Sequence, residues 1–253
     1  MRVHVTGATG FVGRALCPAL AAAGHEQASL ERAEAVVHLA AIAHLRASEE
    51  DLQRVNVDLA VQTARRAAAA GAHFVFLSSV KVHGEESRSP LGAASPLAPR
   101  DRYAASKVRA EEALRAIAGL GLTVLRPPLV YGPGVKANFL SLMSAVARGW
   151  PLPLASVRNR RSLIYVGNLA AAILDCLGKE GTFLVSDGAA VSTPQLCREL
   201  GVALGRPARL FAFPPALLPP KLSRSLEILH TGRKPPFTRE QGLRATAQWF
   251  RAL

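Results

Sequence analysis

The sequence predicts an α/β protein in which helices cover both faces of a parallel sheet. Three observations carry this prediction. Glycines recur at fixed spacing in residues 6–13, between a short apolar run and an Ala/Leu-rich stretch. Further apolar runs of four to six residues follow along the chain. Helix-like stretches alternate with these runs, as in a Rossmann-like doubly wound sheet whose strands are buried on both faces.

The first element is a strand over residues 3–5, and the glycine turn follows it directly. Gly7, Gly10 and Gly13 have the spacing of a dinucleotide fingerprint, which needs a tight turn, a close approach to a pyrophosphate and a helix packed on a strand. The helix over residues 11–23 would direct its first N–H groups at that phosphate. A tight turn without a ligand is the alternative, and the position after the first strand favours the dinucleotide site.

The second strand of such a sheet should follow the first helix, and Glu31 has the spacing of the acidic residue that binds the adenosine ribose. Yet residues 36–41 already form the next buried strand. From Glu31 to Val36 an extended chain reaches only about 17 Å, whereas the crossing needs about 16 Å along the sheet and about 10 Å across it. We therefore expect that a βαβ piece is missing on the adenosine side and that residues 26–35 form an irregular connection.

The remaining elements follow in order. A helix is expected to begin at Ser48, and an Ala-rich helix covers residues 58–70. Residues 74–77 predict a strand that ends in Ser78 and Ser79, residues 103–117 a helix, and residues 122–126 a strand. Near the end of the sequence, residues 238–250 have the cap and the apolar spacing of an amphipathic helix. The chain therefore divides into a dinucleotide-binding part, 1–132, and a small substrate lobe, 133–253, with about 161–184 returning to the sheet.

The composition argues against several classes of protein. No run approaches the roughly 18 apolar residues needed to cross a bilayer, so we expect a cytoplasmic protein without membrane insertion. The three cysteines form no pairing pattern, and neither a metal nor a disulfide is implied. The net charge of +13 invites a nucleic-acid interpretation. However, the basic residues are dispersed and no aromatic-rich basic strand is present, so attraction of a small anionic substrate is favoured.

Tyr103 and Lys107 stand four positions apart and share one face of a predicted helix. A nearby cation stabilises a phenolate, so the tyrosine could exchange protons nearer neutral pH than its usual pKa of about 10. Ser79, at the end of a strand, could bind the same substrate oxygen. A surface tyrosine and a solvated lysine are the alternatives for this pair.

Six motifs occur in a fixed order: TGATGFVG, VVHLAA, FVFLSS, YAASK, RPPLVYGPG and NRRSLIYV. In this order they resemble the extended short-chain dehydrogenases/reductases of the NAD-dependent epimerase/dehydratase family, which act on nucleotide sugars. The later motifs are similar to those of bacterial enzymes acting on the 4-keto group of UDP-linked 6-deoxy-N-acetylhexosamines for surface polysaccharide, and the family includes UDP-glucose 4-epimerases.

The resemblance implies a role for each matching residue. Ser79, Tyr103 and Lys107 would be the catalytic set, with Tyr103 and Lys107 also contacting the cofactor, NAD or NADP. The other cofactor-binding residues would be Gly7, Gly10, Phe11, Val12, Gly13, Leu39, Ala40, Ala41, Pro127 and Val130. The nucleotide-diphosphate sugar, most simply a UDP-sugar, would contact Ser79, Val80, Lys81, Asn138, Phe139 and Arg161. A homodimer through two helices is usual in this family.

At three positions the sequence differs from the usual family pattern, and one of these differences limits the reactions that we expect. Dehydratases carry an Asp-Glu pair immediately after the active-site hydroxyl residue, whereas this chain has Val80 and Lys81, so elimination is disfavoured. His83 replaces a tyrosine, and we interpret it as a loop histidine. Asn168 stands where the family usually has an acidic residue.

Two functions are therefore expected to compete. The first is NAD(P)-dependent reduction or epimerisation at C4 of a nucleotide-diphosphate sugar. The alternative is a non-catalytic relative that binds a nucleotide or a partner, because the missing adenosine side removes cofactor contacts. The intact Ser79, Tyr103 and Lys107 set favours the enzyme.

Overall fold

The computed structural model describes residues 1–43, 47–229 and 234–253, and these form two compact units. Unit 1 comprises Met1–Gly84, Gly92–Pro127 and Leu169–Val185. Unit 2 comprises Glu85–Leu91, Pro128–Asn168 and Ser186–Leu253. The chain thus passes into unit 2 at Glu85–Leu91, again after Pro127, and finally after Val185.

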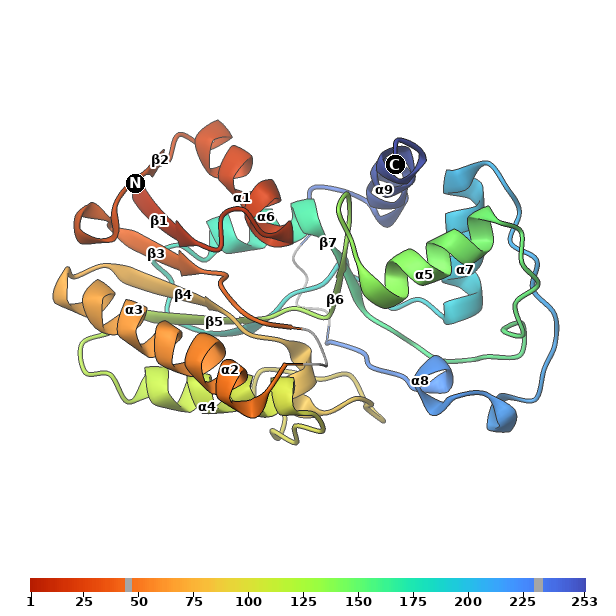
Figure 1. Cartoon of the computed structure of the whole chain (residues 1–253), viewed down its shortest axis with the longest axis horizontal. Helices are drawn as coiled ribbons and strands as arrows, with labels where there is room; N and C mark the ends of the chain where they lie inside the picture. The colour runs from red at the N-terminus through yellow and green to blue at the C-terminus, as the bar shows by residue number, and fades with distance from the viewer. Residues whose placement is uncertain (44–46, 230–233) are drawn as a thin grey trace. The chain divides into compact units, whose positions relative to one another are not determined.

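Unit 1 is built on a six-stranded parallel sheet of order β2-β1-β3-β4-β5-β8 (Figure 1). Val5, Val37 and Val75 lie side by side in neighbouring strands, which shows the common register. The sheet confirms the predicted α/β class. Its strands are β1 (Arg2–Thr6), β2 (Glu26–Gln27), β3 (Ala35–His38), β4 (His73–Leu77), β5 (Leu122–Arg126) and β8 (Gly181–Leu184).

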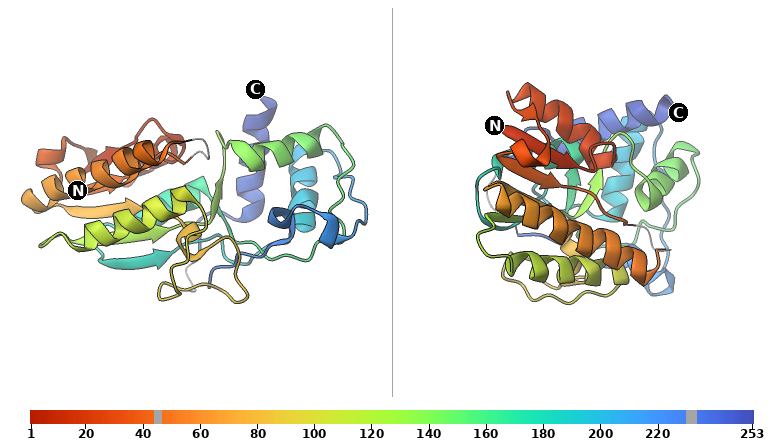
Figure 2. Two further views of the ribbon diagram at one scale, coloured as in Figure 1. Left: turned by 60° about the horizontal axis from the view of Figure 1, so that its bottom comes forward. Right: turned by 60° about the vertical axis from the view of Figure 1, so that its left-hand side comes forward.

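Helices cover both faces of this sheet (Figures 1 and 2). One face carries α1 (Phe11–Ala22) and the part of α6 (Val166–Asp175) that belongs to unit 1. The other face carries α2 (Glu49–Leu52), α3 (Leu59–Ala69) and α4 (Arg102–Arg115). The small buried residues Ala60, Ala64 and Ala67 of α3 belong to one core cluster with Phe74 and Phe76 of β4. Their three- and four-residue spacing places them on one face of the helix, which explains the Ala-rich stretch.

The adenosine side of the sheet is shortened as expected, but residues 26–35 are not wholly irregular. Glu26–Gln27 pairs with β1 as a two-residue strand, and Leu30–Arg32 forms a 3-10 turn, η1. Ala28 donates its N–H to Val3 O and Glu34 donates to Arg2 O, so the chain passes from one edge of β1 to the other. Because β2 ends at Gln27, seven residues remain for this crossing and can span about 23–25 Å.

The helical region after β3 contains a wide turn that the sequence did not reveal. Ser48 caps α2 as predicted, because its Oγ accepts the N–H of Asp51. Between α2 and α3 the six residues Gln53–Asp58 form a π-helix, η2. The turn carries the buried Asn56. Such bulges interrupt an α-helix chiefly at functional positions.

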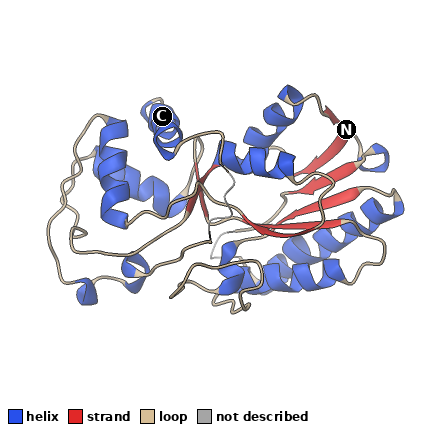
Figure 3. Cartoon of the chain, turned by 180° about the vertical axis from the view of Figure 1, so that it is seen from behind, coloured by secondary structure: helices blue, strands red, loops and turns tan. Residues whose placement is uncertain are grey.

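Unit 2 contains a two-stranded parallel sheet and a group of helices (Figure 3). Helix α7 packs against both α5 and α9. Helix α9 begins with a capping box of Thr238 and Gln241, which confirms the predicted terminal helix. The elements of unit 2 are β6 (Leu129–Tyr131), α5 (Ala137–Ala147), β7 (Leu163–Tyr165), α7 (Thr193–Leu204), η4 (Pro215–Leu217), α8 (Pro220–Ser223) and α9 (Arg239–Arg251).

Within the described parts of both units, every helix is too short or too polar to cross a bilayer.

Candidate active site

The predicted site residues of unit 1 gather where four neighbouring strands end. The glycine turn follows β1, Leu39 follows β3, Ser79 follows β4 and Pro127 follows β5. These strands are parallel neighbours in the sheet, so their carboxyl ends share one edge. Ligands of doubly wound folds bind at this edge.

The glycine turn leaves no room for side chains. Gly7 has φ +73°, and a Cβ there would lie 2.9 Å from Ala40 N. A Cβ on Gly13 would lie 2.4 Å from both Ala8 O and Gly7 O. Gly10 precedes α1 and supplies no side-chain cap, so the first N–H groups of the helix are left for an anion. The turn therefore fits a dinucleotide pyrophosphate.

The segment after β3 is fixed beside this turn. Leu39 donates its N–H to Thr6 O at 3.2 Å, and Ala40 donates to Thr6 Oγ1 at 3.3 Å. The ring of His38 completes the contact, with Nδ1 3.1 Å from the same Oγ1. Burial lowers the pKa of His38 to about 3, with Lys107 adding to the effect, so this histidine is neutral.

Ser79 and Tyr103 are brought together. Ser79 Oγ accepts the N–H of Lys81 at 3.2 Å, which leaves its own proton available to another oxygen. Burial raises the pKa of Tyr103 to about 12, and the neighbouring Asp101 adds to this, while the Ser79 hydroxyl opposes it. The expectation that the phenol ionises nearer neutral pH is therefore wrong for the protein without ligands, in which Tyr103 is protonated.

Lys107 lies one helical turn after Tyr103, and its ammonium has other partners. Nζ donates to Leu77 O at 2.9 Å and lies 4.5 Å from the ring centre of Phe76. Burial lowers the pKa of Lys107 to about 7, although Glu111 opposes the shift. The side-chain groups that shift the pKa of Tyr103 are Asp101 and Ser79, so the predicted effect of Lys107 on the phenol is replaced by that of Asp101.

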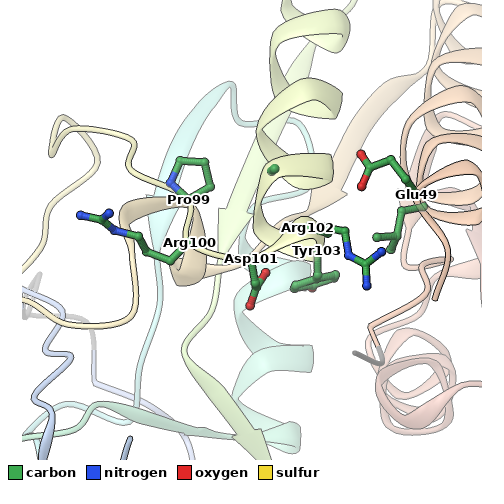
Figure 4. Close-up of a pocket in the computed structure, with 8 residues that line it drawn as sticks. Glu49, Pro99, Arg100, Asp101, Arg102 and Tyr103 are labelled. Carbon is green, nitrogen blue, oxygen red and sulfur yellow. The ribbon is translucent and has the colours of Figure 1, made fainter. Parts of the chain in front are cut away.

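A pocket of about 510 Å³ opens beside Tyr103 (Figure 4). Asp101 and Tyr103 lie next to each other at the start of α4, and Glu49 of α2 faces them. Four of the eight lining residues are charged, and the others offer apolar surface beside the Tyr103 phenol. The lining residues are Glu49, Leu52, Pro99, Arg100, Asp101, Arg102, Tyr103 and Ala105.

Val80 and Lys81 stand where dehydratases of the family carry two carboxylates. Each contacts another part of unit 1. Val80 is buried and donates its N–H to Pro127 O at 2.9 Å. Lys81 Nζ lies 2.6 Å from Asp101 Oδ2. Neither residue supplies the acid or base that elimination needs.

His83 ends the 3-10 turn Val80–His83 and belongs to a buried network. Its Nδ1 lies 3.0 Å from Pro96 O and its Nε2 3.1 Å from Arg126 NH1. Arg126 is also paired with Glu111, which accepts the Ser78 hydroxyl at 2.6 Å. Burial lowers the pKa of His83. The network holds the loop after Ser79 against β5 and α4.

The remaining predicted residues belong to unit 2. Val130 lies in β6, and Asn138 and Phe139 lie in the first turn of α5. The ring of Phe139 stacks on Tyr131, with ring centres 5.3 Å apart. Arg161 is half-buried before β7, and burial lowers its pKa.

Arg161 has few partners in unit 2. Its guanidinium donates to Lys221 O at 3.1 Å. Among the residues that the structure describes, no carboxylate lies within 4 Å of it. The Glu85 carboxylate opposes the lowering of the Arg161 pKa without being in direct contact. A desolvated guanidinium with no carboxylate in contact suits an anionic ligand.

Asn56 is a residue that the sequence interpretation missed. From the π-turn its amide accepts the N–H of Ile42 at 2.8 Å and donates to Ser106 Oγ at 2.9 Å. Ser106 in turn donates to Tyr103 O at 2.8 Å. Asn56 therefore ties the segment after Ala41 to the helix of Tyr103 and Lys107. A polar residue at a buried helical position was the available signal.

The comparisons with known proteins agree with this geometry. The model of the NAD dependent epimerase/dehydratase family matches residues 3–34 and 27–183. The two matches overlap at 27–34, the short connection through η1 between β2 and β3. A UDP-glucose 4-epimerase from Vibrio cholerae is 38% identical over 255 residues, covering 87% of this chain and 78% of that protein. One from Mycolicibacterium smegmatis is 27% identical over 313 residues, covering 99% of each.

Solved structures share the fold. The UDP-N-acetylglucosamine 4-epimerase from Bacillus cereus has a TM-score of 0.85 at 18% identity and covers 99% of each chain. RMD from Pseudomonas aeruginosa, complexed with NADPH, has a TM-score of 0.82 at 24% identity, covering 100% of this chain and 99% of that one. With its glycine turn, its parallel sheet and the matched residues 3–183, this chain belongs to the NAD-dependent epimerase/dehydratase family.

Proposed function

We propose that this protein catalyses NAD(P)-dependent reduction or epimerisation at C4 of a nucleotide-diphosphate sugar. The observation that carries the proposal is the meeting of Ser79 and Tyr103 at the sheet edge, with Lys107 one turn further along the same helix. A nicotinamide cofactor, when bound, supplies or accepts the hydride. Gly7, Gly10 and Gly13 with the N-terminus of α1 would hold its pyrophosphate.

The chain's own residues would handle the proton. Tyr103 would donate from its phenol oxygen to the oxygen on C4, and Ser79 would orient that oxygen with its free hydroxyl proton. The pKa of Tyr103 is raised to about 12, so the phenol carries its proton at neutral pH and can act as the acid in ketone reduction.

Substrate recognition would come from unit 2. Asn138 and Phe139 would contact the nucleotide sugar, and Arg161 would pair with its diphosphate, since a guanidinium matches phosphate oxygens in a bidentate manner. Names of relatives support a nucleotide sugar: MoeE5 was solved with UDP-glucuronic acid and NAD, and a Thermotoga maritima epimerase with UDP-glucose. A role in surface polysaccharide synthesis in the cytoplasm belongs to the same proposal.

A homodimer also belongs to the proposal, with α3 and α4 as the contact surface. On α3, Leu59 is 39% exposed, and Arg65 and Arg66 lie on the solvent side. Light scattering coupled to size exclusion would measure the mass in solution, and a monomer at all concentrations would contradict this part.

The alternative is a non-catalytic nucleotide- or partner-binding protein. Glu31 favours it, because this residue lies in the η1 turn and is paired with Arg66 rather than ending a strand beside a ribose. Loss of one charge-assisted hydrogen bond weakens binding by about 1.5–3 kcal/mol.

Tyr103→Phe separates the two functions. For the enzyme, nicotinamide oxidation with a UDP-4-keto sugar should fall by a factor of at least about 10² while cofactor binding measured by calorimetry is retained. Unchanged turnover in this variant would reject the catalytic role of Tyr103. Absence of NAD(H) and NADP(H) binding to the wild type would reject the proposed function as a whole.

A further inference from the structure

Lys81 connects the turn that follows Ser79 to the start of α4. It lies in the 3-10 turn Val80–His83, directly after β4 and Ser79. Its backbone N–H donates to Ser79 Oγ at 3.2 Å. Its ammonium donates to Asp101 Oδ2 at 2.6 Å, across 20 residues of sequence. One residue therefore contacts the serine hydroxyl with its backbone and the start of α4 with its side chain.

Asp101 completes the connection through its second oxygen. Oδ1 accepts the N–H of Ala104 at 2.6 Å and so caps α4. Tyr103 lies in this capped first turn. The Asp101 side chain is 17% exposed and that of Lys81 is 40% exposed, so the ion pair lies partly out of solvent. A single carboxylate links the turn of Ser79 to the turn of Tyr103.

We propose that Lys81 is a positioning residue that acts through Asp101 on Tyr103, holding the phenol beside the Ser79 hydroxyl and offsetting the negative charge next to it. The inference rests on the proposed function, because it assigns a task within the same site. It also gives a use to the residue that stands where dehydratases have a carboxylate.

The two partners act on the phenol with opposite signs. The Asp101 carboxylate raises the pKa of Tyr103, and the Lys81 ammonium neutralises that carboxylate. The other charged groups at the pocket are Glu49, which is paired with Arg109, and Arg100 and Arg102. Their charges are present in every variant of Lys81 or Asp101, so they do not contribute to the difference between variants.

The test compares Lys81→Met with Asp101→Asn. Asparagine caps helices about as well as aspartate, so Asp101→Asn removes the charge and keeps the cap. The ¹³Cζ resonance of labelled tyrosine, recorded by NMR at pH 7 with Tyr103 assigned from Tyr103→Phe, follows the phenol without any turnover. Lys81→Met leaves the Asp101 charge uncompensated and Asp101→Asn removes it, so the two variants should move the Tyr103 resonance in opposite directions. The double variant should fall between them.

Activity gives the second measurement. Lys81→Met should lower kcat by up to about tenfold with KM little changed, because a phenol beside an uncompensated carboxylate is a weaker acid, and Lys81→Arg should restore most of the loss. Arg244→Met, which breaks an exposed ion pair with Glu240 in unit 2, is the matched control and should change neither reading.

The outcomes distinguish this inference from the proposed function. Shifts of the Tyr103 resonance in the same direction in both variants, or in neither, overturn the inference even when the wild type is active. A wild type without turnover rejects the proposed function, and the NMR measurement still decides whether Lys81 acts on Tyr103. Melting curves verify that each variant is folded.

Discussion

Asn168 donates from its amide nitrogen to Asp187 Oδ1 across 2.7 Å, and its amide also exchanges two hydrogen bonds with the backbone of Phe237. Burial raises the pKa of Asp187, although its hydrogen bonds oppose the shift. The same carboxylate accepts from Tyr131, whose ring stacks on Phe139. This explains why the chain has an amide where the family usually has an acid: a carboxylate at position 168 would face Asp187 and could not donate.

Asn168→Asp should therefore destabilise the protein. It places two carboxylates together and removes the donors to Asp187 and to Phe237 O, at a cost of about 2–4 kcal/mol. Urea unfolding measures the loss. The cost should shrink on acidification, because protonating one carboxyl removes the repulsion and restores a donor. Adding Asp187→Asn should recover stability at neutral pH, and an equal loss with and without that change would contradict this explanation.

Lys107 should make stability depend on pH in the alkaline range. Its folded pKa is about 7 and its ordinary value 10.5, so between these values the unfolded chain binds more protons than the folded one. Stability should rise with pH across this window, by about 1.4 kcal/mol per pH unit, and fall again on acidification toward pH 7. Urea unfolding at several pH values measures the slope.

Lys107→Met should abolish that slope, because the titrating group is gone. Lys179→Met, at an exposed lysine before β8, is the control and should retain it. A slope that survives in Lys107→Met would assign the pH dependence to another group.

Gly13→Ala should disturb both the fold and the nucleotide site. The new Cβ would lie 2.4 Å from two backbone oxygens, and overpacking of this kind costs about 1–3 kcal/mol. Calorimetry should show weaker NAD(H) or NADP(H) binding along with a lower melting temperature. A Cβ at Gly92 meets nothing within 4 Å, so Gly92→Ala should behave like the wild type. Wild-type binding in Gly13→Ala would show that the turn can relax.

Arg126→Met should be among the most damaging single changes in unit 1. It leaves the Glu111 carboxylate buried, at 2% exposure, without its main cation, which costs about 3–5 kcal/mol. Changing both partners to methionine should cost less than the single change, because the Glu111 carboxylate is then no longer buried without Arg126. Guanidinium unfolding of the single and double variants measures the difference. Equal losses would mean that the two side chains contribute separately.

Local patterns explain what could be predicted from the sequence. Apolar runs such as the one containing Val36 and Val37 identify buried strands. Ser48 and Thr238 are N-cap residues, and they mark where helices begin. The glycine turn is partly local, since Gly10 and Gly13 pack against Gly7 and Ala8, whereas Gly7 packs against Leu39 and Ala40. These features depend on neighbours in the sequence, so the sheet, the main helices and the predicted dinucleotide turn were accessible before the structure.

The interactions of the site residues were harder to predict from the sequence, because their partners lie far away along the chain. Lys107 was predicted to act on Tyr103 because the two are four positions apart, but its ammonium donates to Leu77 O, 30 residues earlier. The charge that adjusts the phenol comes from Asp101, whose partner Lys81 is 20 residues away. Spacing along one helix gives a shared face, whereas the direction of each side chain depends on what the fold places opposite.

The two-residue β2 makes the outer edge of the sheet a natural place for protein engineering. The strands from β1 to β5 keep a continuous parallel register beside it, and they carry the site residues of unit 1. The junction between Gln27 and Ala28 is therefore an insertion point at which a βαβ module from a longer relative could be grafted. A chimera of this kind would separate the architecture that anchors a nucleotide from the architecture that positions the proton donor.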